Sequence, residues 1–172
     1  MTVVPSDTYA ERLVVVAMLD HLYDDLAGDS LPHLRVLHEV AGSGLRVADF
    51  LDRRCALAYA AILALREHGW PVSIHTVYRW CRKSTNVEHH IDADWLAGLD
   101  ADLPTVYGVG WWASRIVEKA KERRKMAAGE RIAEGGLTDE QAIALVEGAV
   151  GRVRPAETVL EPWPLIGAQQ VG

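Results

Sequence analysis

The hydrophobic positions of this chain follow the spacing of helices throughout. Apolar residues recur at intervals of three and four, and no segment shows the alternation of period two that marks a half-buried strand. We therefore predict an all-α fold, a compact multi-helix orthogonal bundle with a C-terminal helical hairpin. The longest apolar run, residues 55–65, is apolar on all sides of a helix, which predicts a central helix buried on every side.

Capping residues and helix breakers set the predicted boundaries of the other helices. Residues 41–44 and 84–91 are predicted loops, because they are rich in glycine or in polar residues. The predicted helices are 7–27, 32–40, 48–68, 74–83, a short helix capped by Asp92, 109–133 and 139–150.

The segment 50–82 allows two interpretations. In the first, residues 73–83 are the recognition helix of a DNA-binding helix-turn-helix, with a basic outer face formed by His75, Arg79, Arg82 and Lys83. In the second, Ile74, Val77, Tyr78 and Cys81 lie at i, i+3, i+4 and i+7 and pack inward as core. The connection at 68–72 is longer than the usual turn of about three or four residues. That length and the apolar first helix favour the core.

A helical hairpin is predicted at the C-terminal end. Gly135 and Gly136 end the helix 109–133, and Thr138 with Gln141 has the spacing of a capping box, with Leu137 placed as a hydrophobic staple. We predict one domain over 1–134, a second hairpin helix within 135–153, and a proline-containing linker or tail over 154–172.

Composition narrows the class of protein. With 172 residues, of which 49% are hydrophobic, the chain is long enough for a real core. A net charge of −6 argues against a protein that coats nucleic acid.

The N-terminus lacks the pattern of a signal peptide, and no apolar run approaches a transmembrane length, so we expect no membrane association. Cys55 and Cys81 are predicted to be buried thiols, which favours the cytoplasm.

No motif of catalysis is present in the chain. It contains no GxxxxGK[ST], no HExxH and no paired cysteines at zinc spacing. His89 and His90 are predicted to lie in a solvated loop rather than to hold a metal. We expect no catalytic residue, no cofactor and no metal in this chain. Whether the chain is part of an enzyme then depends on the other domains or proteins with which it assembles.

The order of several short motifs resembles the N-terminal domain of the replicative DNA helicases known as the DnaB-like family. The similarity covers about residues 5–134, and Ser73 and Gly108 depart from the family's usual helix caps. The residues that carry it are Pro5, Glu11, Val14-Val15, Met18-Leu19, Phe50, Tyr59-Ala60-Ala61-Ile62, Leu65, Gly69, Pro71-Val72, Thr76-Val77, Trp95-Leu96, Leu99, Pro104-Thr105, Trp111-Trp112-Ala113, Lys119-Ala120 and Arg123.

The resemblance implies a non-catalytic collar or scaffold. Such a domain forms dimer-based homo-oligomers through its hairpin and docks primase or a helicase loader during DNA replication. The ATP-dependent helicase activity would reside in a motor domain, which would also make the contact with DNA. An alternative is a stand-alone adaptor that binds a host helicase or primase. The residues expected at the self-association or partner surface are Trp111, Trp112, Arg115, Ile116, Lys119, Arg123, Arg124, Leu145 and Val146.

Overall fold

The computed structural model describes residues 7–23, 31–83, 91–101 and 108–150. Within these ranges the chain is helical and contains no strand, which confirms the predicted all-α fold. The elements in order are α1 (Thr8–Tyr23), α2 (Leu31–Ser43), the 3-10 helix η2 (Val47–Asp49), α3 (Arg53–Glu67), α4 (Ile74–Lys83), α5 (Ala93–Ala101), α6 (Val109–Ala133) and α7 (Asp139–Val150).

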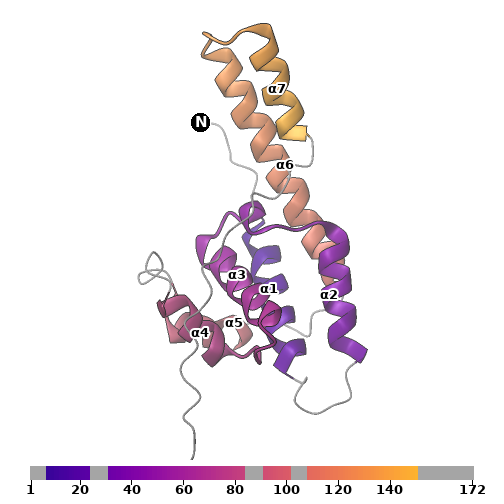
Figure 1. Ribbon diagram of the computed structural model, residues 1–172, viewed down its shortest axis with the longest axis vertical. Coiled ribbons are helices and arrows are strands. Elements are labelled where there is room, and N and C mark those ends of the chain that lie inside the picture. Colours follow the sequence, from indigo (N-terminus) through magenta and orange to yellow (C-terminus); the bar gives the residue numbers. More distant parts are fainter. Residues whose placement is uncertain (1–6, 24–30, 84–90, 102–107, 151–172) are drawn as a thin grey trace, which may run out of the picture.

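The helices form a body and a stalk (Figure 1). Helices α1 to α5 and the first half of α6 make up the body, and the second half of α6 projects from it with α7 alongside. The predicted C-terminal hairpin is therefore present, and most of it stands clear of the hydrophobic core.

The core is centred on α1. Residues 13–19 of this helix are all buried, and α1 packs against α2, α3 and α6. The prediction that residues 55–65 form a helix buried on every side is wrong, because Leu63 is 40% exposed and Leu57 is only partly buried. Helix α3 packs against α1 and α4, which leaves one side of it at the surface.

Two helix boundaries differ from the prediction. Helix α3 begins at Arg53 rather than near residue 48, because Asp52 caps it by accepting a hydrogen bond from the Arg54 backbone N–H at 2.8 Å. Helix α2 continues to Ser43, so most of the predicted loop 41–44 is its last turn, and Gly44 ends it with a φ of 72°. The predicted helix end at 24–27 and most of the loop 84–91 lie outside the described residues.

Helix α4 has the predicted boundaries and a mostly predicted orientation. Ser73 caps it by accepting a hydrogen bond from the Thr76 backbone N–H at 3.2 Å. Val77 and Cys81 are buried, and Tyr78 is partly buried. The inward prediction is wrong for Ile74, because this first residue of the helix lies at the edge of the body and stays exposed. His75, Arg79, Arg82 and Lys83 are exposed as predicted.

Both cysteines are buried and unpaired, as predicted. Burial raises the pKa of the Cys81 thiol to about 12 and raises the pKa of the Cys55 thiol as well. Both thiols are therefore protonated packing groups at neutral pH.

Candidate self-association surface

Helix α6 changes its surroundings halfway along its length. Val109, Ala113, Ile116 and Ala120 recur at helical spacing and are buried against α1 and α2. Beyond this point only Ala128 and Ala149 are buried among residues 121–150. The first half of α6 is thus part of the body, and the second half shares with α7 a core of two small side chains.

The turn between α6 and α7 is built as predicted. Gly135 and Gly136 have φ values of 77° and 78°, the left-handed region that favours glycine. The Gln141 backbone N–H donates to Thr138 Oγ1 at 3.3 Å, and the Thr138 N–H donates to Gln141 Oε1 at 3.1 Å. This reciprocal pair confirms the capping box and fixes where α7 begins.

Helix α7 carries two apolar stripes. Ala142, Leu145 and Ala149 lie at i, i+3 and i+7 on the side that packs against α6. A second stripe, also at i, i+3 and i+7, faces solvent: Ile143, Val146 and Val150 are 59%, 48% and 53% exposed. Val146 therefore lies on a different side from Leu145, although both were expected at one self-association or partner surface. One stripe holds the hairpin together and the other has no partner within the described residues.

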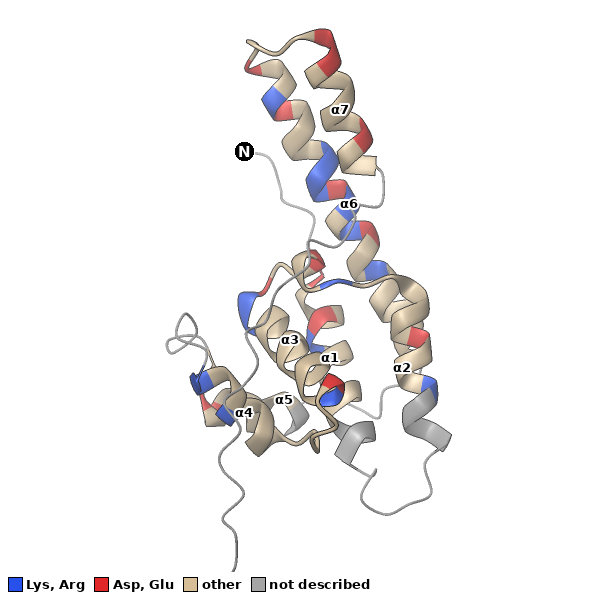
Figure 2. Ribbon diagram, in the orientation of Figure 1, with Lys and Arg blue, Asp and Glu red and all other residues tan. Residues whose placement is uncertain are grey.

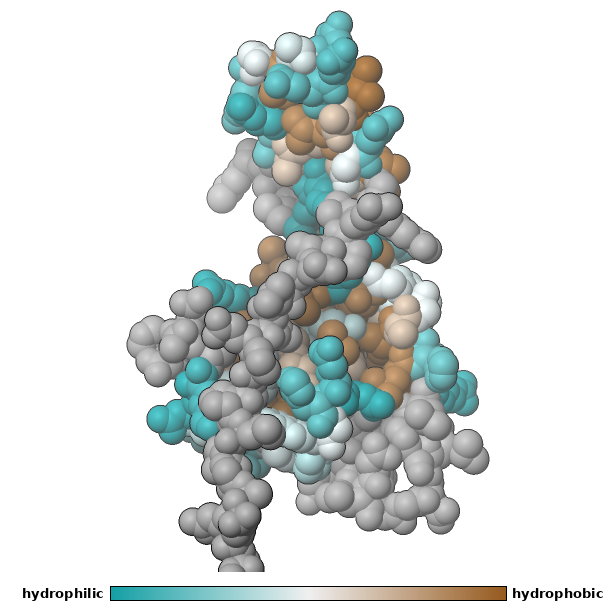
Figure 3. Space-filling view, in the orientation of Figure 1, coloured by the Kyte–Doolittle hydropathy of each residue, from teal (hydrophilic) through white to brown (hydrophobic). Residues whose placement is uncertain are grey.

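An open apolar groove of about 700 Å³ runs between the two helices of the stalk. Ala127 and Ala128 of α6 line one wall, and Leu145 and Ala149 of α7 line the other. Alanine side chains are too short to fill the space between the helices, so the groove stays hollow. Figure 3 shows apolar residues, in brown, on the stalk between hydrophilic ones.

Arg123 and Arg124 join the stalk to the body. Arg124 Nη1 forms an ion pair with Asp49 Oδ1 at 2.7 Å, and Arg123 Nη2 donates to the Asp49 backbone carbonyl. Asp49 is buried, and its Oδ2 also accepts the Arg46 backbone N–H at 3.0 Å. Both arginines were expected at a partner surface, and the structure places them in contacts within the chain.

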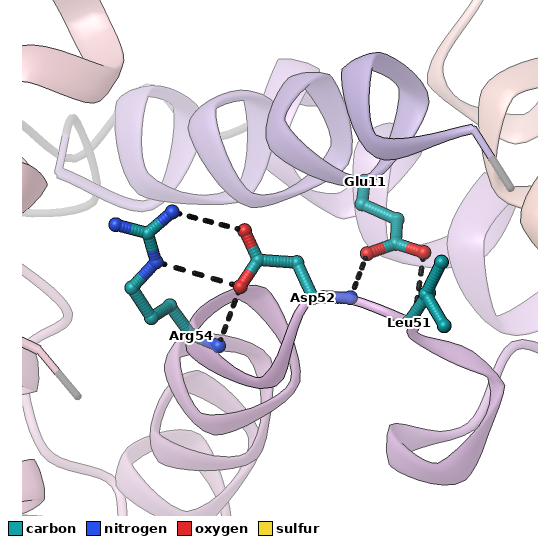
Figure 4. Close-up of polar contacts among 4 residues, drawn as sticks. All are labelled: Glu11, Leu51, Asp52 and Arg54. Carbon is teal, nitrogen blue, oxygen red and sulfur yellow. Dashed lines mark hydrogen bonds and ion pairs between the residues drawn. The ribbon is translucent and has the colours of Figure 1, made fainter.

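A buried glutamate holds the segment next to Asp49. Glu11 is 1% exposed, and its two carboxylate oxygens accept the backbone N–H groups of Leu51 and Asp52 at 2.7 and 2.8 Å (Figure 4). Burial raises the pKa of Glu11 above its ordinary value, outweighing these two hydrogen bonds and the nearby Arg123 charge. Sequence reasoning used Glu11 only as a family landmark. Its place inside the apolar run of α1 was the signal that it has a structural partner.

The aromatic residues at the start of α6 form a cluster on the body. Trp111 is 57% exposed, and its ring meets the ring of partly buried Trp112 edge-on with centroids 4.5 Å apart. Tyr9 of α1 packs edge-on against Trp112 with centroids 5.8 Å apart. The Arg115 guanidinium lies 5.2 Å from the centroid of the Trp111 ring, and its Nε pairs with Asp7 Oδ2 at 2.7 Å.

The nine residues predicted for the surface therefore do not form one patch. Trp111, Trp112 and Arg115 lie at the base of α6, Arg123 and Arg124 at the junction of body and stalk, and Leu145 with Val146 on the stalk. Lys119 pairs with Glu122 at 2.8 Å along the exposed side of α6. Including Ile116 was wrong, because it is 1% exposed and lies in the core between α6 and its neighbours.

The described residues contain neither a cluster of metal ligands nor a membrane-spanning helix. No group of three or more His, Cys, Asp or Glu side chains within those ranges could hold a metal ion. The predicted solvated pair His89 and His90 lies outside them. None of the helices described is both long enough and apolar enough to cross a membrane.

An all-α body with a projecting helical hairpin is the class of fold that this chain adopts. The family model described as the DnaB-like helicase N-terminal domain matches residues 32–118. The chain belongs to this family.

Two relatives illustrate the similarity. The replicative DNA helicase DnaB of Leifsonia xyli subsp. xyli is 31% identical over 150 residues, which cover 87% of this chain and 30% of that protein. The replicative DNA helicase DnaB of Mycobacterium leprae is 30% identical over 143 residues, covering 83% of this chain and 22% of that protein. The chain thus spans less than a third of the length of either relative.

The fold is also that of a solved structure. The crystal structure of the N-terminal domain of DnaB helicase from Mycobacterium tuberculosis matches with a TM-score of 0.67 and 27% sequence identity. The match covers 86% of this chain and 98% of that one, so almost the whole of that domain has a counterpart here.

Proposed function

We propose that this chain is a non-catalytic collar or scaffold domain of a replicative DNA helicase and that it self-associates through its α6–α7 hairpin. Membership of the DnaB-like family supports the context, and the second apolar stripe of α7 supports the mechanism. The stripe formed by Ile143, Val146 and Val150 is the observation on which the proposal rests.

Burial of this stripe is the physical drive for association. Removing each of its three side chains from water stabilises the assembly by roughly 25 cal/mol per Å² of apolar area buried. The adjacent groove between α6 and α7 offers a hollow into which apolar side chains of a second copy fit. Two hairpins packed through stripe and groove would bury an area near the standard interface of about 1,600 Å².

Sedimentation velocity across a range of concentrations tests the proposal. The wild-type chain is expected to form dimers or larger dimer-based assemblies, and the Val146→Glu variant is expected to remain monomeric. Glutamate at this position places a charge at the centre of the interface, where desolvation is costly. The side chain is half-exposed in the single chain, so the variant is expected to fold.

Leu63→Glu supplies the matched control. Leu63 is also a partly exposed apolar residue, but it lies on α3 in the body, away from the stalk. The control is expected to associate as the wild type does. A wild-type chain that stays monomeric at high concentration, or a control that dissociates as readily as Val146→Glu, contradicts the proposal.

The proposal also covers the partners of this domain, the motor domain and the cellular compartment. We place primase or a helicase loader as the docked partner, an ATPase motor beyond the linker 154–172, and the assembly in the cytoplasm. The division into 1–134, 135–153 and 154–172 follows from this arrangement. Pull-down of the chain with its cognate primase tests docking, with the exposed Trp111→Ala as the first variant because tryptophan is enriched at binding hot spots.

A stand-alone adaptor would use the same surfaces without a motor of its own. The coding sequence that follows Gly172 distinguishes the two arrangements. A Walker motif downstream in the same reading frame indicates a helicase, and its absence there indicates an adaptor.

A further inference from the structure

We propose that the exposed face of α4 binds the phosphate backbone of DNA without reading its sequence. This face carries a stripe of basic residues, His75, Arg79, Arg82 and Lys83, which lie at i, i+4, i+7 and i+8. At a rise of 1.5 Å per residue the stripe is about 12 Å long. The inference is independent of self-association through the hairpin and adds a direct DNA contact to that function.

Charge distinguishes this helix from the rest of the molecule. The chain carries a net charge of −6, yet α4 contains three Lys or Arg residues and no acidic residue. Helix α5 packs against α4. Just before α5, Asp92 Oδ1 accepts the Trp95 backbone N–H at 2.6 Å, and within α5 Asp94 is exposed. Figure 2 shows the Lys and Arg positions of α4 at the side of the body away from α6.

The arginines of α4 are also more available than the arginines of α6. Four cations of α6 form ion pairs, in which their charge is already compensated: Arg115 with Asp7, Lys119 with Glu122, Arg124 with Asp49 and Arg131 with Glu134. Within the described residues Arg79 and Arg82 form no ion pair with a carboxylate. An unpaired guanidinium has its planar fork free for the bidentate contact that it makes with phosphate.

The stripe rests on a rigid support. Val77 and Cys81 anchor the opposite side of α4 in the core, and the Ser73 cap fixes its first turn. The Arg82 guanidinium lies 5.9 Å from the centroid of the Tyr78 ring, which holds the side chain along the helix. The cations are therefore presented in a defined row and lose little freedom when they bind.

The make-up of this face favours nucleic acid over a protein partner. The centre of a protein interface is apolar and depleted in charged residues, whereas charge runs along the middle of this face. Base reading is not expected, because recognition helices contact bases mainly through their N-terminal residues. In that part of α4 the Thr76 hydroxyl is already used, donating to the Pro71 carbonyl at 2.8 Å.

Fluorescence anisotropy with the full 172-residue chain tests the proposal. Mixed-sequence labelled oligonucleotides, single-stranded and duplex, are titrated at several salt concentrations. Binding is expected to weaken linearly on a log–log plot against salt, as counterions are released. Comparing the affinities for the single-stranded and the duplex oligonucleotides identifies the form of DNA that supplies the phosphates.

The double variant Arg79→Ala/Arg82→Ala assigns the contact. It is expected to bind about tenfold more weakly at low salt and to reduce the salt slope by about 1 for each arginine. Alanine has the highest helix propensity, so α4 is expected to stay folded, which circular dichroism checks. Sedimentation of the same variant should match the wild type, which separates loss of this contact from loss of assembly.

The double variant Lys121→Ala/Lys125→Ala is the matched control. It removes the same charge from two exposed positions of α6, far from α4, and is expected to keep the wild-type salt slope. Absence of binding at low salt, equal losses in the two double variants, or a strong preference for one DNA sequence overturns the proposal. Competition by poly-glutamate as effective as that by unlabelled DNA overturns it too and indicates an acidic protein partner.

Discussion

Two buried carboxylates secure the junction between the body and the stalk. Glu11 accepts two backbone N–H groups at the entry to α3, and Asp49, in η2, pairs with Arg124 of α6. Both carboxylates are buried with their hydrogen bonds made, which is the condition under which a buried charge is tolerated. The segment 49–52 is thereby attached both to α1, through Glu11, and to α6, through Arg124.

The raised pKa of Glu11 leads to a pH-dependent prediction. A carboxyl whose pKa in the folded state exceeds its ordinary value of 4.5 binds protons more readily in the folded chain. Its contribution to stability is full below that value and is lost as pH rises through the folded-state pKa. Thermal unfolding of wild type and Glu11→Gln should show a wild-type advantage that is larger near about pH 5 than near about pH 7.5.

Glu39→Gln is the control of opposite sign. The hydrogen bond from Arg35, followed by that from the Gly110 backbone N–H, lowers the pKa of Glu39. Its contribution is present above the ordinary value and is lost as pH falls through the folded-state pKa. The wild-type advantage over this variant should shrink on acidification and be small, because the pair with Arg35 is exposed. Equal pH trends in the two variants would show that the assignment of Glu11 is wrong.

Loss of the Arg124 side chain is expected to destabilise the chain more than loss of another α6 arginine. Arg124→Ala leaves the buried Asp49 carboxylate without its ion pair, at a cost of about 1–3 kcal/mol in the free energy of unfolding. Arg131→Ala removes an exposed pair with Glu134, which is worth about 0–1 kcal/mol. Urea denaturation measures both, and equal costs would contradict the role given to Arg124.

At the scale of elements, α6 does two different tasks within one continuous helix. Its first half fills the body through Val109, Ala113 and Ile116, and its second half supports α7 through Ala128. The two halves differ because α1 and α2 flank only the first. A helix of 25 residues is about 37 Å long. Figure 1 shows that α6 extends beyond the body.

A glycine-to-alanine substitution is expected to have opposite effects in the α6–α7 turn and within helix α6. Gly136→Ala forces a side chain into the left-handed region and should cost about 1–2 kcal/mol in the free energy of unfolding. Gly129→Ala lies within α6 with open space around the added methyl group and should stabilise by about 0.5–1 kcal/mol. Chemical denaturation compares the pair, and a destabilising Gly129→Ala would mean that helix propensity does not limit the stalk.

At the scale of the whole molecule, burial is unevenly distributed. The body holds nearly all of the buried side chains, and the stalk holds two alanines. Two helices with so small a shared core bury too little apolar surface to be stable by themselves. The stalk is therefore expected to depend on its attachment at Asp49 and on a second copy.

This dependence predicts a melting temperature that rises with protein concentration. Association stabilises the folded state by mass action, so a tenfold increase in concentration raises the melting temperature of the wild-type chain. Differential scanning calorimetry should show this rise, and Val146→Glu should abolish it. A rise that persists in Val146→Glu would place the interface elsewhere than on α7.

Much of the fold could be predicted from local sequence. The bounds of α4, α6 and α7, the cap at Ser73 and the turn at Gly135 and Gly136 were all predicted correctly. Each depends on residues within one or two turns of one another, since capping, propensity and glycine conformation act over that range. The all-α class follows from the same local periodicity.

The tertiary structure decided which apolar and charged positions are free. Local pattern could not show that α1 rather than α3 lies at the centre, because both are apolar on most sides and only packing decides which is surrounded. It could not show that Arg124 is paired within the chain, because its partner Asp49 is 75 residues away. Sequence alone thus determined the bounds of several helices and the exposed basic face of α4, because both depend on local spacing. The packing of distant segments determined that α7 keeps an apolar stripe open to solvent and that Arg124 is paired within the chain.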